Sequence, residues 1–321
     1  SFFDPPAITT HDPFLMKNMD LAVERLNAAV TAKETILVFG DYDVDGTTSV
    51  ALVYSVLQPY TSVHFYIPDR YEEGYGLSFQ GIDEAKRLGA TLVIALDCGI
   101  KEVEKVRYAR EMGIDVIVCD HHTPGEELPD AIILDPKQQD CNYPFKELCG
   151  CGVGYKLMEA FHLKNEIDPV VLNDYLDLVA IAIGADIVSV TGENRYLCKT
   201  GLKVLNTKPR AGILALLKQA GRALPLSLSD VVFTIAPRIN AAGRLESGMR
   251  SVELLLAKSS SVADSIALEI DEYNKNRRLL DAQMTEEALE QIASDPQFEQ
   301  RKSTVVFQND WHKGVVGIVA S

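Results

Sequence analysis

Residues 36–49 read Ile36-Leu37-Val38-Phe39-Gly40-Asp41-Tyr42-Asp43-Val44-Asp45-Gly46-Thr47-Thr48-Ser49, an apolar run that passes directly into three carboxylates at every second position. The apolar run predicts a buried strand, and alternation places the three carboxylates on one side of the extended segment after it. Their mutual repulsion would destabilise the fold unless a cation offset it. This segment therefore predicts a metal site just past the end of a strand.

Two other interpretations fit the same segment. An EF-hand calcium loop shares Asp41, Asp43, Asp45 and Gly46, but it needs a bidentate Glu at its twelfth position, where Leu52 stands. It also needs a preceding helix, whereas a strand is predicted here. A surface turn rich in Asp is the second alternative, and this segment alone does not exclude it.

Two further apolar runs end in residues of the same kind. Residues 92–96 are followed by Asp97, and residues 116–119 are followed by Asp120, His121 and His122. In an open parallel sheet, ligands bind beyond the carboxyl ends of the strands, so these side chains should converge. Because adjacent histidines cannot both be buried on the same face, one can bind a metal while the other reaches a substrate.

The wider pattern predicts an α/β fold with a parallel sheet. Apolar runs that predict strands alternate with helical patterns, which is typical of βαβ units. The strands are expected at 35–39, 63–67, 92–96, 115–119 and 132–134, and the helices at 47–57, 78–88 and 101–112. From about residue 152 the pattern becomes helical, with helices expected at 152–163, 169–183, 194–205 and 211–219. Residues 261–294 predict one long connecting helix, and residues 304–307 a further strand.

Length and composition favour an intracellular, cytoplasmic enzyme of two domains. The chain has 321 residues, of which 47% are hydrophobic, and this exceeds the usual size of a single core. No run reaches eighteen apolar residues and no signal sequence is evident, so neither a membrane span nor secretion is indicated. The six cysteines lack the spacing of zinc fingers or disulfide frameworks, which favours reduced thiols.

A net charge of −15 argues against nucleic-acid binding at first sight. However, several of the acids are candidate metal ligands, and the basic residues are clustered. Arg238, Arg244 and Arg250 form one cluster. A second cluster at 275–278 fits a nucleic-acid surface and a solvated helix face equally well. The glycine-rich segment 150–154 is interpreted as a tight turn bordering the cleft, and phosphate contact is the less favoured alternative.

Four segments resemble the motifs of the DHH phosphoesterases, in order along the chain. They are Asp41–Gly46, Leu96–Gly99, Asp120–His122 and Gly184–Val188. Three further segments are similar to the branch of this family that degrades single-stranded DNA from its 5′ end. These are Ile67–Gly76, Thr191–Arg195 and Ala236–Arg244.

The resemblance implies a domain organisation. Residues 1–260 would form a DHH domain, 261–300 a connecting helix, and 301–321 the beginning of a DHHA1 domain. Because the chain stops there, we expect it to be a truncated fragment.

The resemblance also implies a centre for two ions of Mn²⁺ or Mg²⁺. Asp43 and Asp97 would bind one ion, and Asp97 would bridge to a second ion bound by Asp45, His121 and Asp186. Many members of the family carry a His where this chain has Phe39, so the first ion would need Asp41 or water, and one-ion resting occupancy is plausible.

Other residues obtain roles from the same resemblance. His122 would donate a hydrogen bond to the scissile phosphate, and Arg70 would bind the 5′-terminal phosphate. The alternative for Arg70 is an ion pair with Glu72 or Glu73. A supporting and phosphate-contacting motif would consist of Arg238, Asn240 and Arg244.

The implied function is a metal-dependent 5′ to 3′ exonuclease of single-stranded DNA in DNA repair and recombination. Its partners would be single-stranded DNA, a single-strand-binding protein and a helicase. One alternative is a DHH phosphodiesterase of short oligonucleotides or cyclic dinucleotides. A non-catalytic replication scaffold is disfavoured, because all the candidate metal ligands are present.

Overall fold

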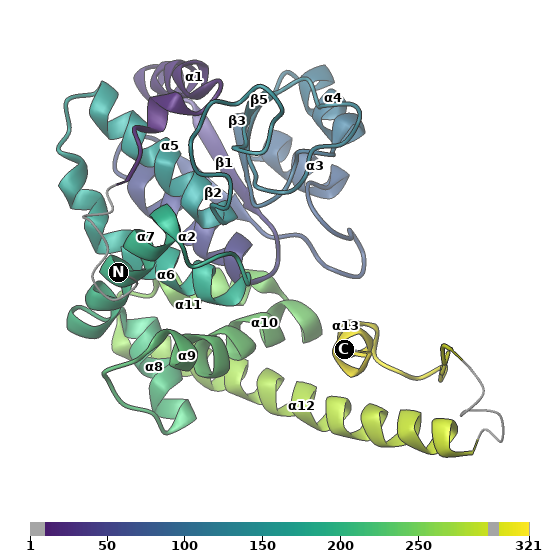
Figure 1. Ribbon diagram of the computed structural model, residues 1–321. Helices are drawn as coiled ribbons and strands as arrows, with labels where there is room; N and C mark the ends of the chain where they lie inside the picture. The colour runs from purple at the N-terminus through teal and green to yellow at the C-terminus, as the bar shows by residue number, and fades with distance from the viewer. Residues whose placement is uncertain (1–9, 295–301, 321) are drawn as a thin grey trace.

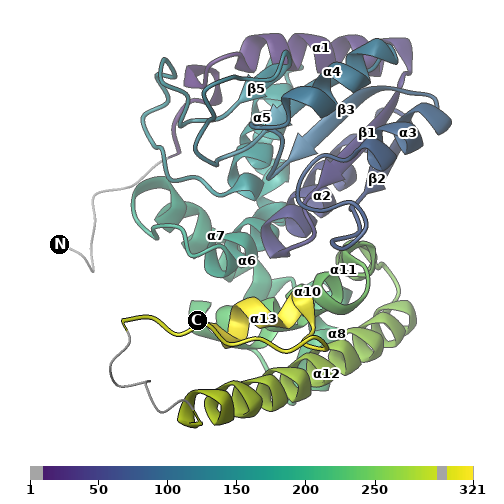
Figure 2. The ribbon, with the colours of Figure 1, turned by 90° about the vertical axis from the view of Figure 1, so that its right-hand side faces the viewer.

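The computed structural model describes residues 10–294 and 302–320. An α/β part lies on top of a helical part, and a long helix runs along the far side of the helical part (Figures 1 and 2). Residues 1–9, 295–301 and 321, which the predicted domains include, lie outside the described residues.

The α/β part is built on a five-stranded, fully parallel sheet with the order β2-β1-β3-β4-β5. The strands are β1 (Thr35–Gly40), β2 (Val63–Tyr66), β3 (Ala90–Leu96), β4 (Asp115–Cys119) and β5 (Ile132–Leu134). Each agrees with its expected position to within two residues. The predicted α/β fold with a parallel sheet is therefore confirmed.

Helices cover both faces of this sheet. Ile36 and Val38 of β1 point into the core shared with α1 (Met19–Ala32), α2 (Val44–Leu57) and α5 (Gly150–Lys164). Leu37 and Phe39 point to the opposite core, which α3 (Phe79–Arg87) and α4 (Val103–Glu111) complete. Because β1 is buried on both faces, its sequence is a continuous apolar run rather than an alternating one.

The helical part packs below the sheet. Its elements are a 3₁₀ helix (η2, Pro169–Tyr175), α6 (Leu176–Ala185), α7 (Gly192–Thr207), α8 (Ala211–Ala220), α9 (Leu228–Asp230), a π-helix (η3, Val231–Ile235), α10 (Ala236–Leu245) and α11 (Gly248–Leu256). A short 3₁₀ helix (η1, Pro13–Leu15) precedes α1. The single helix expected at 169–183 is wrong in its first half, where Asp168 caps a 3₁₀ helix that begins with Pro169.

The long helix α12 (Ser260–Ala293) agrees with the expected connecting helix. The strand expected at 304–307 is wrong: this segment is irregular, and Val305 and Phe307 are 91% and 72% exposed. A strand needs a neighbour to accept its backbone hydrogen bonds, and no described strand lies beside it. The chain continues into α13 (Lys313–Val319), which packs against α10 and α12.

Two composition-based expectations can be compared with the structure. All six cysteines are buried and unpaired, in agreement with reduced thiols. Within the described residues, no helix combines the length and the apolar character needed to cross a bilayer.

Candidate metal centre

The acidic segments meet at the carboxyl edge of the sheet. In the order β2-β1-β3-β4-β5, chain connections leave β1 and β3 in opposite directions, and such a switch point is where open α/β sheets bind ligands. Asp41 directly follows β1 and Asp97 directly follows β3. His121 is the second residue after the end of β4. The topology therefore brings these side chains together although they are far apart in the sequence.

Two helix N-termini fix the carboxylates of the first motif. Asp43 caps α2 by accepting a hydrogen bond from the Gly46 N–H at 3.1 Å. Asp45 lies in the first turn of α2, and its two oxygens accept hydrogen bonds from the N–H groups of Gly150 and Cys151 at 2.6 and 2.7 Å. Both N–H groups belong to the first turn of α5.

The glycine-rich segment is thus the beginning of a helix, and its interpretation as a tight turn is wrong. Its first two N–H groups bind the Asp45 carboxylate instead of a phosphate. Gly150 is required by close approach, because a Cβ atom there would lie 2.6 Å from the Cβ of Asp97.

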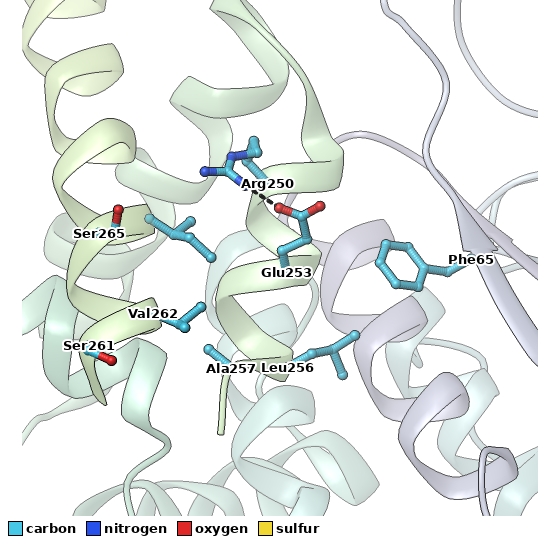
Figure 3. Close-up of a pocket in the computed structure, with 9 residues that line it drawn as sticks. Phe65, Arg250, Glu253, Leu256, Ala257, Ser261, Val262 and Ser265 are labelled. Carbon is cyan, nitrogen blue, oxygen red and sulfur yellow. Dashed lines mark hydrogen bonds and ion pairs between the residues drawn. The ribbon is translucent and has the colours of Figure 1, made fainter. Parts of the chain in front are cut away.

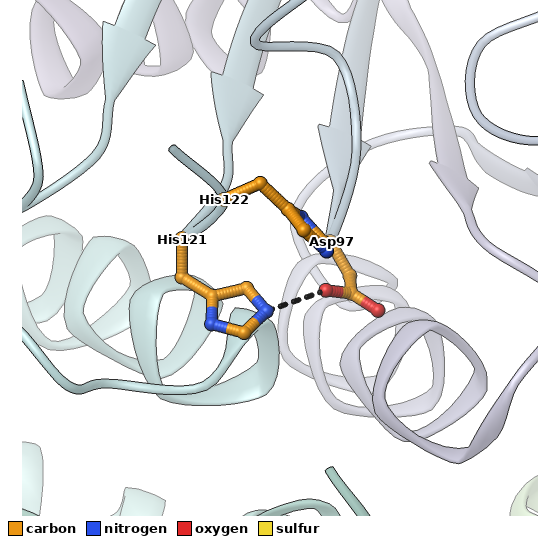
Figure 4. A group of neighbouring side chains, drawn as sticks. All are labelled: Asp97, His121 and His122. Carbon is orange, nitrogen blue, oxygen red and sulfur yellow. Dashed lines mark ion pairs between the residues drawn. The ribbon is translucent and has the colours of Figure 1, made fainter. Parts of the chain in front are cut away.

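His121 lies at the centre of the acid cluster. Its Nε2 is 3.2 Å from Asp97 Oδ1, as Figure 4 shows, 3.5 Å from Asp186 Oδ2 and 3.8 Å from Asp45 Oδ2. Asp186 reaches this position from the C-terminal end of α6. Ligand atoms of four residues from four parts of the chain therefore surround a small volume, with Asp41 and Asp43 beside it.

Three overlapping groups have donor atoms within 4.8 Å of one another. They are Asp41, Asp43 and Asp97; Asp45, His121 and Asp186; and Asp97, His121 and His122. The structure thus brings together all six side chains expected as metal ligands. Asp97 belongs to two of the groups, which is the arrangement that a bridging carboxylate needs.

Several of these atoms are buried and have no partner. Of the nine buried side-chain polar atoms without a hydrogen bond in the described residues, five belong to Asp41, Asp97, His121 and Asp186. Unpaired buried polar atoms are rare and costly unless an ion or water binds them. Carboxylate oxygens with one imidazole suit Mn²⁺ or Mg²⁺, so the donor set fits a divalent cation.

The electrostatics point the same way. Burial, and then the charge of Asp43, raises the pKa of Asp41 to about 8 and that of Asp186 to about 6. Burial also raises the pKa values of Asp45 and Asp97, with neighbouring carboxylates adding to the effect. Burial lowers the pKa of His121 to about 4, which keeps its imidazole neutral and able to bind a metal. Without an ion, the raised pKa values favour protonated carboxyls, and a bound cation would stabilise their charged forms in place of the protons.

His122 differs from His121 in its surroundings. Its Nδ1 lies 2.7 Å from Asp120 Oδ1, and its Nε2 lies 3.3 Å from the Tyr75 hydroxyl. The hydrogen bond that His122 Nδ1 donates to Asp120 raises the pKa of His122. Burial raises the pKa of Asp120, but the hydrogen bond and charge of His122, together with the backbone N–H groups of Ile100 and His122, outweigh burial and lower it. The pair therefore favours a protonated His122 beside the acid cluster.

Sequence reasoning assigned no role to Asp120, although this residue organises the third motif. Its Oδ1 also accepts hydrogen bonds from the backbone N–H groups of His121 and His122, and its Oδ2 accepts one from Ile100. Its place directly after β4 was a usable signal. Tyr75 lies within the family-like segment Ile67–Gly76, but sequence reasoning assigned it no role of its own.

Basic residues border the cluster. The Arg70 guanidinium lies 4.9 Å from the ring centroid of Tyr42, the residue between Asp41 and Asp43. In the described part of the chain, Arg70 makes no ion pair with Glu72 or Glu73, which was its alternative role, and Glu73 instead accepts hydrogen bonds from Tyr66 and Ser78.

Arg244 and Asn240 also lie near the first motif. Burial, and then the charges of Arg70 and Arg277, lowers the pKa of Arg244, and its Nη1 donates to the carbonyl of Gly314 at 2.8 Å. Asn240 Oδ1 accepts from the Val44 N–H at 3.1 Å, which holds the backbone between Asp43 and Asp45.

Arg238 and Arg250, the other members of the basic cluster, are bound to α12. Arg238 pairs with Asp271 at 2.9 Å, and Arg250 with Glu269 at 2.5 Å. Arg250 also pairs with Glu253 in a cavity of about 590 Å³ between α11, α12 and Phe65 (Figure 3). None of the expected metal ligands lines this cavity, so it is separate from the candidate metal centre.

Phe39 also has a defined environment. Its side chain is fully buried on the α3 side of the sheet and stacks on Tyr66 with ring centroids 5.6 Å apart. The position where the family resemblance implies a metal-binding His therefore serves the core here.

The comparisons with known proteins agree with this site. Residues 35–183 match the family described as "DHH family, N-terminal domain". The chain is 42% identical to the single-stranded-DNA-specific exonuclease RecJ of Bacillus subtilis, over 97% of this chain and 39% of that protein. The chain thus spans well under two thirds of the length of this curated relative.

Solved structures give the same result. A RecJ exonuclease bound to manganese matches with a TM-score of 0.86 and 33% identity, covering 98% of this chain and 78% of that one. Thermus thermophilus RecJ in complex with Mn²⁺ matches with a TM-score of 0.83 and 32% identity, covering 99% of this chain and 45% of that one. The resemblance to the DHH phosphoesterases and their single-strand-specific branch is confirmed, and the chain belongs to the RecJ family of DHH proteins.

Proposed function

We propose that this chain carries the catalytic centre of a metal-dependent 5′ to 3′ exonuclease that hydrolyses single-stranded DNA. The observation that carries the proposal is the buried cluster of carboxylates around His121, whose unpaired atoms fit divalent cations. The relatives are named single-stranded-DNA-specific exonucleases, and solved RecJ structures are complexes with Mn²⁺ or Mg²⁺.

The cluster would hold two ions, with Asp97 between them. Asp43 and Asp97, with Asp41, would bind one ion; Asp45, Asp97, His121 and Asp186 would bind the other. When bound, such ions activate water as a nucleophile and stabilise negative charge on a phosphodiester. The N–H groups of Gly150 and Cys151 orient the Asp45 carboxylate for this task.

His122 would act on the substrate and not on the metal. Asp120 holds its Nδ1 and favours its charged form, so Nε2 can donate a hydrogen bond to the scissile phosphate where charge develops. Tyr75 and Asp120 together fix the orientation of the ring.

Arg70 would set the direction of digestion by binding the 5′-terminal phosphate. Its position above Tyr42, next to the first motif, supports this role. Arg244 would add a second guanidinium for the DNA backbone, and Asn240 would support the metal-binding loop. We assign Arg238 a structural contribution to the same motif through Asp271.

Further assignments follow from the family. We propose a DHH domain over residues 1–260, a connecting helix over 261–300 and the beginning of a DHHA1 domain over 301–321. A single-strand-binding protein and a helicase are the proposed protein partners, and the cytoplasm is the proposed location.

A digestion assay tests the function. With Mn²⁺ present, the protein should degrade a single strand and release labelled 5′-terminal mononucleotides first, while leaving a blunt duplex intact. Faster hydrolysis of a dinucleotide or cyclic dinucleotide than of a long single strand would favour the small-substrate phosphodiesterase. Binding of the strand without hydrolysis of any substrate would favour the scaffold.

A further inference from the structure

The chain turns sharply just after Asp186, and the residue at the turn is Ile187. Asp186 ends α6, and Ile187 follows it with a φ of 58°, in the left-handed region. This conformation is usual directly after a helix, but Gly or Asn normally adopts it. For a β-branched residue it is a genuine outlier that destabilises the fold.

Other contacts explain the turn but not the choice of residue. The N–H of Asp186 donates to the carbonyl of Ala182, and Val188 packs against the core, so the backbone must reverse at residue 187. Among the described residues, seven of the positions with positive φ are Gly, and Ile187 is the only β-branched one. A Gly or Asn would make the same turn with less strain.

The side chain does not compensate by burial. Ile187 is 93% exposed, the largest value among the large apolar residues of the described chain. An apolar side chain that is strained and fully solvated contributes almost nothing to folding. Contacts among the described residues therefore do not explain why Ile stands at this position.

The location of Ile187 offers an explanation. The Ile187 Cα lies one peptide step, about 3.8 Å, from that of Asp186, whose Oδ2 is 3.5 Å from His121 Nε2. A nucleotide that flanks a phosphodiester bound at the metal centre could therefore reach Ile187. Unpaired bases expose apolar faces, whereas a duplex buries them in its stack.

We propose that Ile187 is a substrate-positioning residue that packs against an unpaired base flanking the scissile phosphate. This inference rests on the proposed exonuclease function. It explains why a strained apolar residue stands beside a metal ligand, and it gives the site a contact that favours single strands over duplex. Burying part of the side chain against a base should contribute about a five- to tenfold preference.

The test combines variants of Ile187 with abasic substrates in the full-length natural protein. Ile187→Asn removes the apolar contact in a residue that tolerates the turn, and Ile187→Leu is the matched control that keeps an apolar side chain. Each is assayed for kcat/KM with Mn²⁺ on a 5′-phosphorylated single strand. The strand is either intact or carries one abasic residue at its first, second or third position.

The wild-type protein should lose about five- to tenfold in kcat/KM at one abasic position. Ile187→Asn should show the same loss on the intact strand and less than a twofold further loss on the abasic one, because both changes remove the same contact. Ile187→Leu should stay within about twofold of wild type. The Ile187→Asn variant should keep its Mn²⁺ affinity and unfold at a temperature no lower than that of wild type.

Two results would overturn the inference. Independent, multiplying losses from Ile187→Asn and the abasic residue would mean that they act at different places, and a lowered unfolding temperature would mean that the side chain is structural. If the wild-type protein hydrolysed no strand at all, the exonuclease proposal itself would fail. Equal activity of Ile187→Asn and wild type would refute the role of Ile187 alone.

Discussion

Replacing His122 by Ala separates the two roles that the geometry allows for this residue. Its donor atom lies within 4.8 Å of those of Asp97 and His121, so His122 has the position of a metal ligand as well as that of a substrate contact. Its bond to Asp120 and its raised pKa favour the substrate contact, since a metal ligand must be neutral. We expect His122→Ala to keep its metal sites and to lose turnover.

The magnitude follows from the contact that is lost. Nε2 is the only ring nitrogen available to a substrate, because Asp120 occupies Nδ1. Removing one preorganised donor from a developing charge typically lowers kcat by about 10²–10³, which is about 2.7–4 kcal/mol. The substrate KM should change little, since the contact strengthens in the transition state.

Single-turnover hydrolysis at saturating Mn²⁺ gives the rate, and titration calorimetry gives the number of Mn²⁺ sites. His121→Ala is the matched control, and it should lose a site because its Nε2 lies among three carboxylates. The reasoning would be refuted if His122→Ala lost a Mn²⁺ site, or if its rate stayed within about tenfold of wild type.

A related variant tests the cause of the raised pKa. Asp120→Asn keeps the shape of the acceptor but removes the charge that favours protonated His122. If the charged form is required, activity is lost as pH rises through the pKa of His122. In Asp120→Asn this loss should begin at a lower pH than in wild type, as a pH–rate profile would reveal.

Four other changes have expected outcomes. Asp97→Ala should lower the rate of hydrolysis by several orders of magnitude, because its carboxylate belongs to two groups of metal ligands. Activity within about tenfold of wild type at saturating Mn²⁺ would contradict the role of Asp97 as a bridging ligand. Arg70→Ala should lower the kcat/KM preference for 5′-phosphorylated over 5′-hydroxyl strands, since charge-assisted bonds contribute about 1.5–3 kcal/mol, and an unchanged ratio would return Arg70 to a structural role. Gly150→Ala should weaken Mn²⁺ binding at least tenfold by displacing Asp97, whereas the control Gly152→Ala, whose Cβ would be 3.4 Å from its nearest neighbour, should not. Metal-free protein should lose thermal stability as pH rises from about 4 to about 8. In the folded state the pKa of Asp41 is raised to about 8, so folding favours its neutral form and is weakened when the group ionises. A chelator should therefore lower the melting temperature more at pH 8.5 than at pH 6.

The sheet and most of the metal ligands could be predicted from the sequence because both depend on local patterns. A strand buried on two faces is a continuous apolar run, and a ligand at the carboxyl edge directly follows such a run. Asp41 and Asp97 satisfy this rule, and His121 lies one residue further on, after Asp120. Asp186 does not satisfy it, since it follows a helix, and only its resemblance to a family motif identified it.

The features that sequence reasoning missed depend on contacts between distant residues or on unusual helix starts. The α5 N-terminus is capped by the Cys149 sulfur, which accepts from the Gly152 N–H at 3.3 Å, and Cys is not among the usual N-cap residues. Helix α1 begins after Asn18 in the left-handed conformation, without a side-chain cap. Residues 304–307 have the composition of a strand but no neighbour to pair with.

The N-termini of α2 and α5 help several carboxylates to occupy one buried site before any ion binds. The N-terminus of a helix carries roughly half a positive charge, which stabilises a carboxylate in its first turn. The structure directs two such ends at the cluster, α2 through Asp43 and α5 through Asp45. Asp41, Asp97 and Asp186 have no such help, and they are the carboxylates that retain unpaired buried oxygens. The helices thus stabilise one side of the cluster. The unpaired carboxylate oxygens lie on the other side, where Asp97 faces His121, and a cation would gain the most by binding there.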